Sequence, residues 1–486
     1  MARPPTQFRA LRVAMPQLTD QAGLTWTIEE ILRATNGQLT GRWPRTALGP
    51  VTINSRSLVP GEVFVAIRGA RLDGHHFVDA AVARGASCLI VSRPVVLSES
   101  VAAVPLVLVN DTTRALAELG RFRRRQLDRP VIAVTGSCGK TTTKELIAHV
   151  LETPDQVLKT AGTQNNHIGV PLTLLRMNPL HRYAVVELGS NHPGEISGLA
   201  SIVEPDLAVV TNVGPVHLEF FGSLMGVLHE KLSLLDAVPA DGTVVLPGDQ
   251  LEICLEAPRY LKPGVRIVTF GLTDRCDIQA VDIRRTEQGM AVRLRDHVAQ
   301  WRLPIVGVHN VENMLAAVAC AWAIGVPLSV VRDRLATFSP VPMRSQLVQA
   351  NGVTILNDCY NANPLSVARA LETLCELPVR RRVAIVGDML ELGEYTAPAH
   401  QAIGRLAAKL GVESILAVGE HASHVRQGAS DTRPDAVTTY HTVPELLADL
   451  PSMIKAGDGV LVKGSRRLNL ERVTEFLTQP ASRGQL

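Results

Sequence analysis

The chain has 486 residues, which at roughly 150 residues per domain predicts about three domains and excludes a minimal scaffold stapled by disulfides or metal ions. Hydrophobic residues make up 46% of the chain and charged residues 20%, an ordinary globular composition that excludes wholesale disorder. The formal net charge of +3 is too small to indicate a surface that binds polyanions.

Three features of the sequence indicate a cytoplasmic protein without a membrane span. Two arginines and a proline interrupt residues 9–18, so no apolar core of an export signal develops there. Residues 314–331 carry no charge, but Gly325 and Pro327 should end a helix near Ile324, so we expect a buried helix of a soluble domain. The seven cysteines include no C-x-x-C pair, which favours reduced thiols over a zinc ribbon or a disulfide framework.

The first section, residues 1–126, is predicted to be a small α/β domain that follows an extension of about 24 residues. Thr27-x-x-Glu30 has the pattern of a capping box and should start a helix. Apolar runs predict strands, and one amphipathic stretch predicts a short helix. The strands are expected at 62–67, 86–91 and 104–109, and the helix at 79–84.

The arginine-rich run RFRRR at 121–125 precedes Asp128-Arg129-Pro130, where we expect a domain boundary. The run is a candidate nucleic-acid patch, or else the solvated end of a helix before a linker. Because charge is balanced elsewhere in the chain, the solvated helix end is favoured and no nucleic-acid partner is expected.

The second section, residues 127–339, and the third, residues 340–486, alternate apolar strand runs with helical patterns, which predicts mostly parallel sheets covered by helices. The expected fold class is α/β with three domains, the last of them Rossmann-like. Strands are expected at 131–135, 184–188, 207–213 and 243–246, then at 354–357, 383–386, 414–418 and 460–462. Two such sheets in series suggest a site at their interface, beyond the carboxyl ends of the strands.

The strongest local pattern is VIAVTGSCGKTT, in which a buried strand leads through a glycine turn into a helix. Gly136 and Gly139 let backbone N–H groups approach an anion, the helix N-terminus adds partial positive charge, and Lys140 can neutralise phosphates. Thr141 or Thr142 would place a hydroxyl on Mg²⁺. The central domain is therefore expected to be of the P-loop type, although the glycine spacing is not the standard one. The alternative is a glycine-rich turn without a ligand.

Polar residues follow the next two predicted strands of the central section. Glu187 ends one strand beside a glycine, where a carboxylate can hold Mg²⁺, or where it is simply a solvated strand end. His217 and Glu219 follow the other strand, and an imidazole in that place favours a functional role over a structural one. Lys231, on the following helix, has the pattern of an ordinary surface lysine.

Taken together, these motifs resemble those of the Mur ligase family, the ATP-dependent amide-forming enzymes of peptidoglycan precursor synthesis. The matching blocks follow the family's order: TGSCGKTT (135–142), TQNNHIGVP (163–171), VELGSNHPGEI (186–196), TNVGPVHLEFFGS (211–223), GVHNVENMLAA (307–317), NDCYNANPLSVARAL (357–371), VGDMLELGE (386–394) and VLVKGSRRLNLE (460–471). Residues 54–86 are similar to the family's uridine-nucleotide-binding domain. The sequence departs from the family pattern at Asn54, Met343 and Asn357.

The resemblance implies roles for individual residues. For ATP it implies Gly136, Ser137, Cys138, Gly139, Lys140, Thr141, Thr142, His309, Asn313 and Arg344. For two Mg²⁺ ions it implies Thr141, Glu187, His217 and Lys231, the last of them carbamylated. For catalysis it implies Lys140, His217, Lys231, Arg344 and Asp358. For the substrates we take Ser55, Arg56, Gly69, Asp73, His75, Asn165, Asn166, Tyr360, Asn361 and Asn363. Without the modification, Lys231 would be a phosphate counter-charge or an exposed lysine, and residues 360–364 alone also fit a turn built from Asn and Pro.

Within the family, YNANP (360–364) and GDMLELG imply the activity that adds D-alanyl-D-alanine to UDP-N-acetylmuramoyl-tripeptide. That reaction passes through an acyl phosphate and releases ADP and phosphate. We expect a cytoplasmic monomer whose third domain closes over the phosphate loop about a hinge near 338–341. Two alternatives stay open: a ligase for a diamino acid or a folate-type substrate, and a nucleotide-gated binding or regulatory protein.

Overall fold

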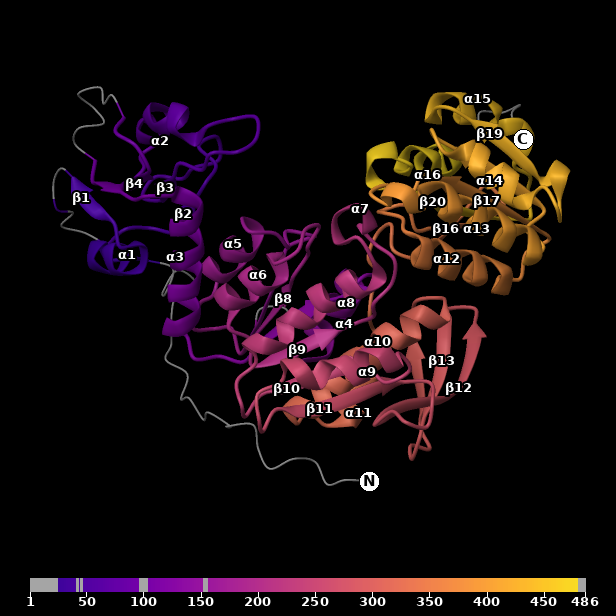
Figure 1. Cartoon of the computed structure of the whole chain (residues 1–486), viewed down its shortest axis with the longest axis horizontal. Helices are drawn as coiled ribbons and strands as arrows, with labels where there is room; N and C mark the ends of the chain where they lie inside the picture. The colour runs from indigo at the N-terminus through magenta and orange to yellow at the C-terminus, as the bar shows by residue number, and fades with distance from the viewer. Residues whose placement is uncertain (1–24, 41–42, 44–46, 96–103, 152–155, 480–486) are drawn as a thin grey trace.

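The computed structural model has three α/β domains that follow one another along the chain, as the sequence predicts. Figure 1 shows the first and third domains on opposite sides of the central one. The structure describes residues 25–40, 43, 47–95, 104–151 and 156–479. Residues 9–18, the segment in which no export signal is expected, and most of the predicted N-terminal extension lie outside the described residues. The predicted domain limits after residues 126 and 339 stay predictions.

The first domain is a five-stranded sheet with helices packed against it. In spatial order the strands are β1 (Gln38–Thr40), β5 (Leu106–Leu108), β4 (Cys88–Val91), β3 (Val63–Val65) and β2 (Val51–Thr52). The helices are α1 (Ile28–Thr35), α2 (Val78–Ala83) and α3 (Thr112–Gln126). The capping box is confirmed, because the Glu30 amide donates to the Thr27 hydroxyl at 3.2 Å and the Thr27 amide donates to the Glu30 carboxylate at 2.9 Å.

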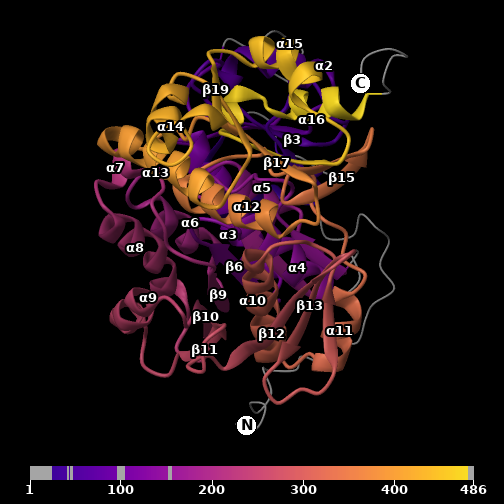
Figure 2. The same cartoon turned by 90° about the vertical axis from the view of Figure 1, so that its right-hand side faces the viewer.

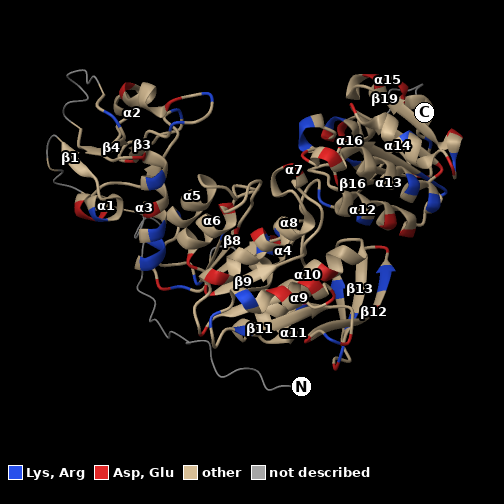
Figure 3. Ribbon diagram, in the orientation of Figure 1, with Lys and Arg blue, Asp and Glu red and all other residues tan. Residues whose placement is uncertain are grey.

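The arginine run at the end of α3 is an interdomain contact, and the prediction of a solvated helix end was wrong. Figure 3 shows this basic half of α3 beside the central domain. Arg124 is 8% exposed and donates to the carbonyl oxygen of Glu204 at 3.0 Å and to the Asp206 carboxylate at 2.8 Å. Arg121 and Arg125 both bind the Glu204 carboxylate. The guanidinium groups therefore join two domains, which removes the basis for a nucleic-acid patch.

The central domain contains a nine-stranded sheet. In spatial order the strands are β14 (Gln300–Leu303), β13 (Gly289–Leu294), β12 (Ile278–Thr286), β11 (Arg266–Gly271), β10 (Thr243–Pro247), β9 (Leu207–Val210), β6 (Val131–Thr135), β8 (Tyr183–Glu187) and β7 (Val157–Lys159). Strand β6 pairs in parallel with β8 on one side and with β9 on the other. The chain passes from β6 to β7 and β8 on one side and then crosses to β9 on the other, and such a switch point opens a crevice beyond the carboxyl ends of the strands.

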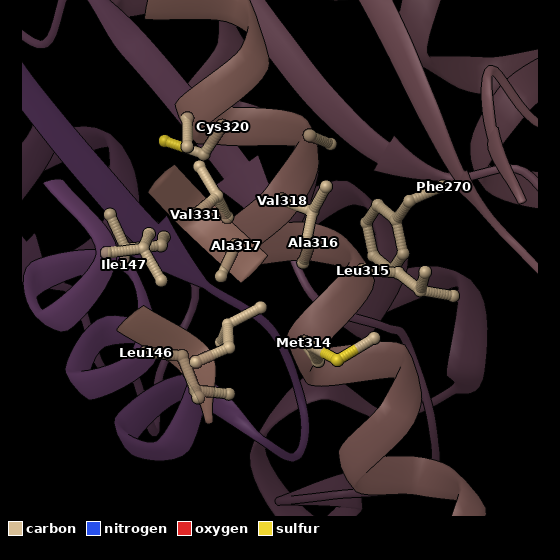
Figure 4. Close-up of a cluster of buried hydrophobic side chains, with 14 of the residues drawn as sticks. Leu146, Ile147, Phe270, Met314, Leu315, Ala316, Ala317, Val318, Cys320 and Val331 are labelled. Carbon is tan, nitrogen blue, oxygen red and sulfur yellow. The ribbon is translucent and has the colours of Figure 1, made fainter. Parts of the chain in front are cut away.

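Helices cover both faces of the central sheet, as predicted. They are α4 (Lys140–Leu151), α5 (Gly169–Leu175), α6 (Glu195–Val203), α7 (Leu218–Phe221), α8 (Leu224–Leu232), α9 (Leu251–Glu256), α10 (Val308–Ile324) and α11 (Leu328–Leu335). Alternate residues of β6 lie in two separate hydrophobic cores. Ile132 lies in the core between the sheet and helices α4 and α10. Ala133 lies in the core between the sheet and helices α5 and α6. Figure 4 shows Leu146 and Ile147 of α4 together with Met314 and other residues of α10 in the first core.

The uncharged segment at 314–331 belongs mainly to α10, which ends at Ile324 as predicted. Gly325 is the C-cap with φ of +91°, a left-handed conformation that glycine adopts without steric cost. The helix lies in the core of the central domain. Within the described residues, no helix is both long enough and apolar enough to cross a membrane.

The antiparallel edge of the central sheet was not predicted. Strands β12, β13 and β14 form a meander in which β12 pairs with β13 and β13 with β14, both antiparallel. Along β14 the residues alternate between exposed and buried, with Trp301 and Leu303 buried. Such alternation is typical of a sheet with one solvated face, which has a weaker hydrophobic pattern than a strand buried on both sides.

The third domain is a six-stranded sheet that is parallel except for its edge strand β15. In spatial order the strands are β15 (Gln346–Ala350), β16 (Val353–Asn357), β20 (Asp458–Lys463), β17 (Arg381–Gly387), β18 (Ser414–Val418) and β19 (Val437–Tyr440). The helices are α12 (Pro364–Glu376), α13 (Thr396–Lys409), α14 (Ala422–Ala429), α15 (Val443–Met453) and α16 (Glu471–Thr478). Helix α12 lies beside α10 of the central domain (Figure 1, Figure 2).

Candidate active site

A cavity of about 660 Å³ lies between the central and third domains, at the interface where the two sheets in series suggested a site. Most of the predicted site residues line it. They are Ser137, Cys138, Gly139, Lys140, Thr141, Thr142, Asn165, Asn166, Glu187, His217, His309, Asn313, Arg344, Asp358, Tyr360, Asn361 and Asn363. Gly136 and Lys231 are not among the described residues that line the cavity, and the five predicted residues of the first domain are also elsewhere.

The glycine turn between β6 and α4 needs both of its glycines. Gly139 has φ of +79°, and a Cβ there would lie 2.2 Å from the Oδ1 atom of Asn313. A Cβ on Gly136 would lie 2.1 Å from the Oγ1 atom of Thr211. The turn is thus kept open by the lack of side chains. The Ser137 amide donates to the carbonyl oxygen of Asn212 at 3.0 Å and the Cys138 amide to its Oδ1 atom at 2.9 Å, so the loop is held against the residues after β9.

The ammonium of Lys140 is folded back over this loop. Its Nζ atom donates to the carbonyl oxygens of Gly136 at 2.7 Å and Ser137 at 3.4 Å. Burial lowers the pKa of Lys140, and the negative charge of Glu187 opposes this shift. An anion in the loop would favour the charged ammonium, because it would replace carbonyl dipoles with a full negative charge.

The loop hydroxyls and the thiol are already in contact with other elements. The Ser137 hydroxyl donates to the carbonyl oxygen of Gly214 at 3.0 Å. Arg344 of the third domain donates to the Oγ1 atom of Thr141 at 3.1 Å. The Cys138 Sγ atom lies 3.2 Å from the side-chain amide of Asn363. All seven cysteines are free thiols, as expected.

Glu187 is a buried carboxylate with one open position. It is 1% exposed at the carboxyl end of β8, which rules out a solvated strand end. Its Oε1 atom accepts from Asn165 at 2.8 Å, while Oε2 has no hydrogen-bond partner among the described residues. The fully buried Lys144, which the sequence did not single out, places its Nζ atom 3.9 Å from Oε2. A buried carboxylate oxygen that accepts no hydrogen bond and lines the same cavity as the glycine turn is a suitable ligand for a hard cation.

Lys231 is buried, which excludes the alternative of an exposed surface lysine. It is 1% exposed on α8, and its Nζ atom donates to the Ser190 hydroxyl at 2.7 Å. Burial, and after it the positive charge of Lys140, lowers the pKa of Lys231 to about 7. In a large fraction of the molecules, the Lys231 side chain is therefore a neutral amine at neutral pH. Ser190 lines the cavity, so Lys231 lies directly behind the wall.

His217 lies at the start of α7 and lines the cavity. Its φ of +49° is a left-handed conformation that is uncommon for a residue other than glycine. Its Nδ1 atom contacts the Oε2 atom of Glu391, which comes from the third domain. The sequence did not single out Glu391, since it lies 174 residues away.

The third domain contributes a compact polar group to the cavity. Lys463, which is 2% exposed at the end of β20, makes a 2.6 Å ion pair with Asp358. The other oxygen of Asp358 accepts from the Ser345 amide at 2.9 Å. The guanidinium of Arg344 stacks on Tyr360 at 4.0 Å from the ring centroid. Lys463 was not among the predicted site residues, although it lies in a matching block.

The polar loop before α12 serves the fold as well as the cavity. Asn363 is the N-cap of α12, and its side chain accepts from the Ser366 amide at 2.8 Å. The Asn361 carbonyl oxygen accepts from Lys463 at 3.0 Å. Asn166 likewise accepts from the amides of Ile168 and Gly169. The alternative of a turn built from Asn and Pro is thus correct in part, because capping satisfies amides that a helix leaves free.

His309 and Asn313 of α10 lie next to the loop and to the third domain. His309 contacts the Ser345 hydroxyl at 3.1 Å, and burial lowers the pKa of its imidazole to about 4, so the ring is neutral. Asn313 accepts from the Thr143 hydroxyl at 3.2 Å. Their predicted place beside adenine stays a prediction.

The five predicted residues of the first domain lie outside the cavity, and two of them, Asp73 and His75, form a local network. His75 is buried, with Nδ1 at 2.6 Å from Asp73 and Nε2 accepting from the Ser92 amide at 3.0 Å. Asp73 also binds Arg93 at 3.0 Å. Gly69 lies on the loop that precedes this network, whereas Ser55 and Arg56 lie after β2. Their predicted role as uridine-nucleotide contacts stays a prediction.

Among the described residues, no group of three or more His, Cys, Asp and Glu side chains is arranged to hold a metal ion. Any cation at this site therefore needs hydroxyl, phosphate or modified lysine oxygens in addition to Glu187 and His217.

The chain matches family models over all three domains. They are the Mur ligase family catalytic domain at residues 49–124, the Mur ligase middle domain at 134–321, and the Mur ligase glutamate ligase domain at 343–466.

Full-length relatives and solved structures agree with this match. The "UDP-N-acetylmuramoyl-tripeptide–D-alanyl-D-alanine ligase" of Escherichia coli (strain K12) is 36% identical over 465 residues, which cover 93% of this chain and 98% of that protein. The "Crystal structure I of MurF from Acinetobacter baumannii" is 33% identical with a TM-score of 0.85, and the match covers 94% of this chain and 99% of that one. The MurF ligase of Thermotoga maritima, solved in complex with ADP, is 30% identical with a TM-score of 0.79, and the match covers 88% of this chain and 97% of that one.

Proposed function

This chain belongs to the Mur ligase family, and on that premise we propose that it is an ADP-forming ligase that joins D-alanyl-D-alanine to UDP-N-acetylmuramoyl-tripeptide in peptidoglycan precursor synthesis. The observation that carries the proposal is the cavity, in which third-domain residues meet the phosphate loop of the central domain. A nucleotide switch would not need Arg344, Asp358 and Lys463 from a second domain at its phosphates. We also propose that the enzyme acts as a monomer in the bacterial cytoplasm.

The chemistry explains why cations surround this cavity. A carboxylate is a poor acyl donor, because attack by an amine would place more negative charge on oxygens that already carry it. Transfer of the γ-phosphoryl group of ATP converts it to an acyl phosphate, from which the amine of the dipeptide displaces phosphate through a tetrahedral oxyanion. Two anions must first approach each other, so positive groups are needed where negative charge develops.

In this proposal the residues of the loop bind ATP through backbone N–H groups and through Lys140. The nucleotide contacts are Gly136, Ser137, Cys138, Gly139, Lys140, Thr141 and Thr142, with His309, Asn313 and Arg344 around them. Lys140 leaves the carbonyl oxygen of Gly136 to pair with the phosphates. Arg344 already reaches Thr141, so it can follow the charge as the phosphoryl group moves to the substrate.

Two Mg²⁺ ions fit the donor set, with Thr141 and Glu187 at one and His217 and carbamylated Lys231 at the other. The open Oε2 atom of Glu187 supports the first assignment. The lowered pKa of Lys231 supports the second, because CO₂ adds only to a neutral amine and turns it into an oxygen ligand. Bound Mg²⁺ would neutralise phosphate and carboxylate oxygens in the transition state.

For the substrates we propose contacts on both sides of the phosphate loop. Tyr360, Asn361 and Asn363 would pair with the amide and carboxylate of D-alanyl-D-alanine. Asn165 and Asn166 would face the acceptor peptide. The uridine diphosphate contacts would be Ser55, Arg56, Gly69, Asp73 and His75.

The test is incubation with UDP-muramoyl-tripeptide, ATP and D-alanyl-D-alanine, with the pentapeptide product detected by mass. Phosphate release should require both the tripeptide and the dipeptide. Release that instead follows a diamino acid or a glutamate would favour another ligase of this family. Slow ATP turnover that is insensitive to every amine would favour the regulatory protein.

Replacement of Asn363 separates its capping role from its role in the dipeptide pocket. Asn363→Ala should lower the free energy of unfolding by about 1 kcal/mol, because α12 loses its N-cap. Asn363→Asp keeps the capping oxygen but loses the amide donor, so its stability should be near that of the wild type. Both variants should raise the KM for D-alanyl-D-alanine. An equal rise of the KM for ATP, or an unchanged KM for the dipeptide in Asn363→Asp, would show that Asn363 is not part of the dipeptide pocket.

A further inference from the structure

Glu391 of the third domain contacts the predicted metal ligand His217 through its side chain and the neighbouring Glu219 through its main chain. Its Oε2 atom meets the Nδ1 atom of His217. Its carbonyl oxygen accepts from the Glu219 amide at 3.3 Å. Two residues further, a Cβ on Gly393 would lie 3.3 Å from the Cα atom of Glu219. The loop after β17 is thus seated directly on the start of α7.

Both partners of this contact have a backbone conformation that is costly for their residue types. His217 has φ of +49° and Glu391 has φ of +63°. A non-glycine residue in the left-handed region is strained and persists only where the surroundings hold it. Glycine would adopt these conformations without strain. We therefore attribute the presence of a histidine and a glutamate at these positions to the contact between their side chains.

The contact selects one form of the imidazole ring. A neutral imidazole has one N–H group and one lone pair, and a carboxylate can only accept a hydrogen bond. With Nδ1 donating to Glu391, the lone pair is left on Nε2. His217 lines the cavity, whereas Glu391 is not among the described residues that do. The nitrogen available to a ligand in the cavity is therefore Nε2.

We propose that Glu391 is a positioning residue that holds His217 in the Nδ1–H tautomer, with the lone pair of Nε2 directed to the cavity. This inference rests on the proposed function, in which His217 is a ligand of Mg²⁺. A histidine that binds a metal ion generally gives its other N–H to a carboxylate or carbonyl oxygen, which fixes the tautomer and the ring orientation. Because Glu391 belongs to the third domain, His217 is oriented only when that domain lies against α7.

The first test observes the tautomer in the metal-free protein, without any assay of activity. Long-range ¹H–¹⁵N spectra of histidine-labelled protein are recorded at about pH 8, above the ordinary pKa of imidazole. The chain has 14 histidines, so the His217 signal is assigned by its loss in His217→Gln. Wild type and Glu391→Gln should show the Nδ1–H tautomer, since a glutamine oxygen still accepts. Glu391→Ala should lose it. The same tautomer in Glu391→Ala would overturn the proposal.

The second test separates positioning from general stability. Glu391→Ala should raise the Mg²⁺ concentration for half-maximal rate by about 10- to 100-fold, and Glu391→Gln by less. Glu394→Gln is the matched control, because Glu394 is an exposed carboxylate on the same loop, and it should behave as the wild type. The double variant His217→Gln/Glu391→Ala should be no slower than His217→Gln. A further loss as large as that of Glu391→Ala alone would show that Glu391 does not act through His217.

The outcomes distinguish this inference from the proposed function. If the wild type forms no pentapeptide, the proposed function fails while the tautomer comparison can still be made. If the wild type forms product but Glu391→Ala leaves the tautomer and the Mg²⁺ dependence unchanged, only the role of Glu391 fails.

Discussion

Lys140→Ala should reduce the rate of pentapeptide formation by about 10³-fold, because the transferred phosphoryl group loses the cation that compensates its developing charge. In the structure the ammonium already lies over the loop, 2.7 Å from the carbonyl oxygen of Gly136. Replacement by alanine leaves both glycines of the turn in place, so the loop itself should keep its shape. The measurement is the steady-state rate of phosphate release with all three substrates.

Thermal unfolding provides the control for Lys140→Ala, since a variant that melts as the wild type does has lost chemistry rather than structure. Lys409→Ala, at an exposed position at the end of α13, should retain full activity. A rate for Lys140→Ala within tenfold of the wild type would exclude this loop as the catalytic phosphate site.

If Lys231 is carbamylated as proposed, Lys231→Ala should be nearly inactive, because the proposed second Mg²⁺ would lose an oxygen ligand and His217 alone would hold it weakly. The substitution also leaves a space behind Ser190, where the buried side chain now lies. Acetate or another short carboxylate should enter this space and restore part of the activity. Rescue of Lys231→Ala by acetate and by methylamine is compared in parallel.

The identity of the rescuing molecule decides what Lys231 does. A carbamate is replaced by a carboxylate, whereas an ammonium that neutralises phosphate is replaced by a small amine. Rescue by methylamine and not by acetate would therefore exclude the carbamate. Activity near that of the wild type without any additive would show that the buried Lys231 has no part in the reaction.

The pH dependence of the wild type follows from the same lysine. The pKa of Lys231 is lowered to about 7, so the amine is neutral above that pH and becomes an ammonium below it. Only the neutral amine reacts with CO₂. Depletion of bicarbonate should therefore depress activity first on the acidic side of about pH 7, and added bicarbonate should restore it. An equal loss at mildly alkaline pH would contradict the carbamate.

The parts of this protein that the sequence alone determined are local ones. The capping box of α1, the glycine turn between β6 and α4, and the end of α10 at Gly325 depend on residues within one or two turns of each other. Their conformations follow from φ preferences and from capping of free amides, which need no distant partner. Continuous apolar runs also identified β6, β8, β9, β10, β16, β17, β18 and β20, because a strand buried on both faces has no polar side, but they did not identify the parallel strands β7, β11 and β19.

The tertiary structure alone decided what pairs with what across long stretches of chain. Arg124 looked solvated because its partners at 203–206 are 79 to 82 residues away. Lys231 resembled a surface lysine because its burial depends on how α8 packs behind the cavity. Glu391 reaches His217 across 174 residues and a domain boundary. A charged side chain is solvated, paired or buried according to its neighbours in space, and packing of whole domains, rather than local preference, determines those neighbours.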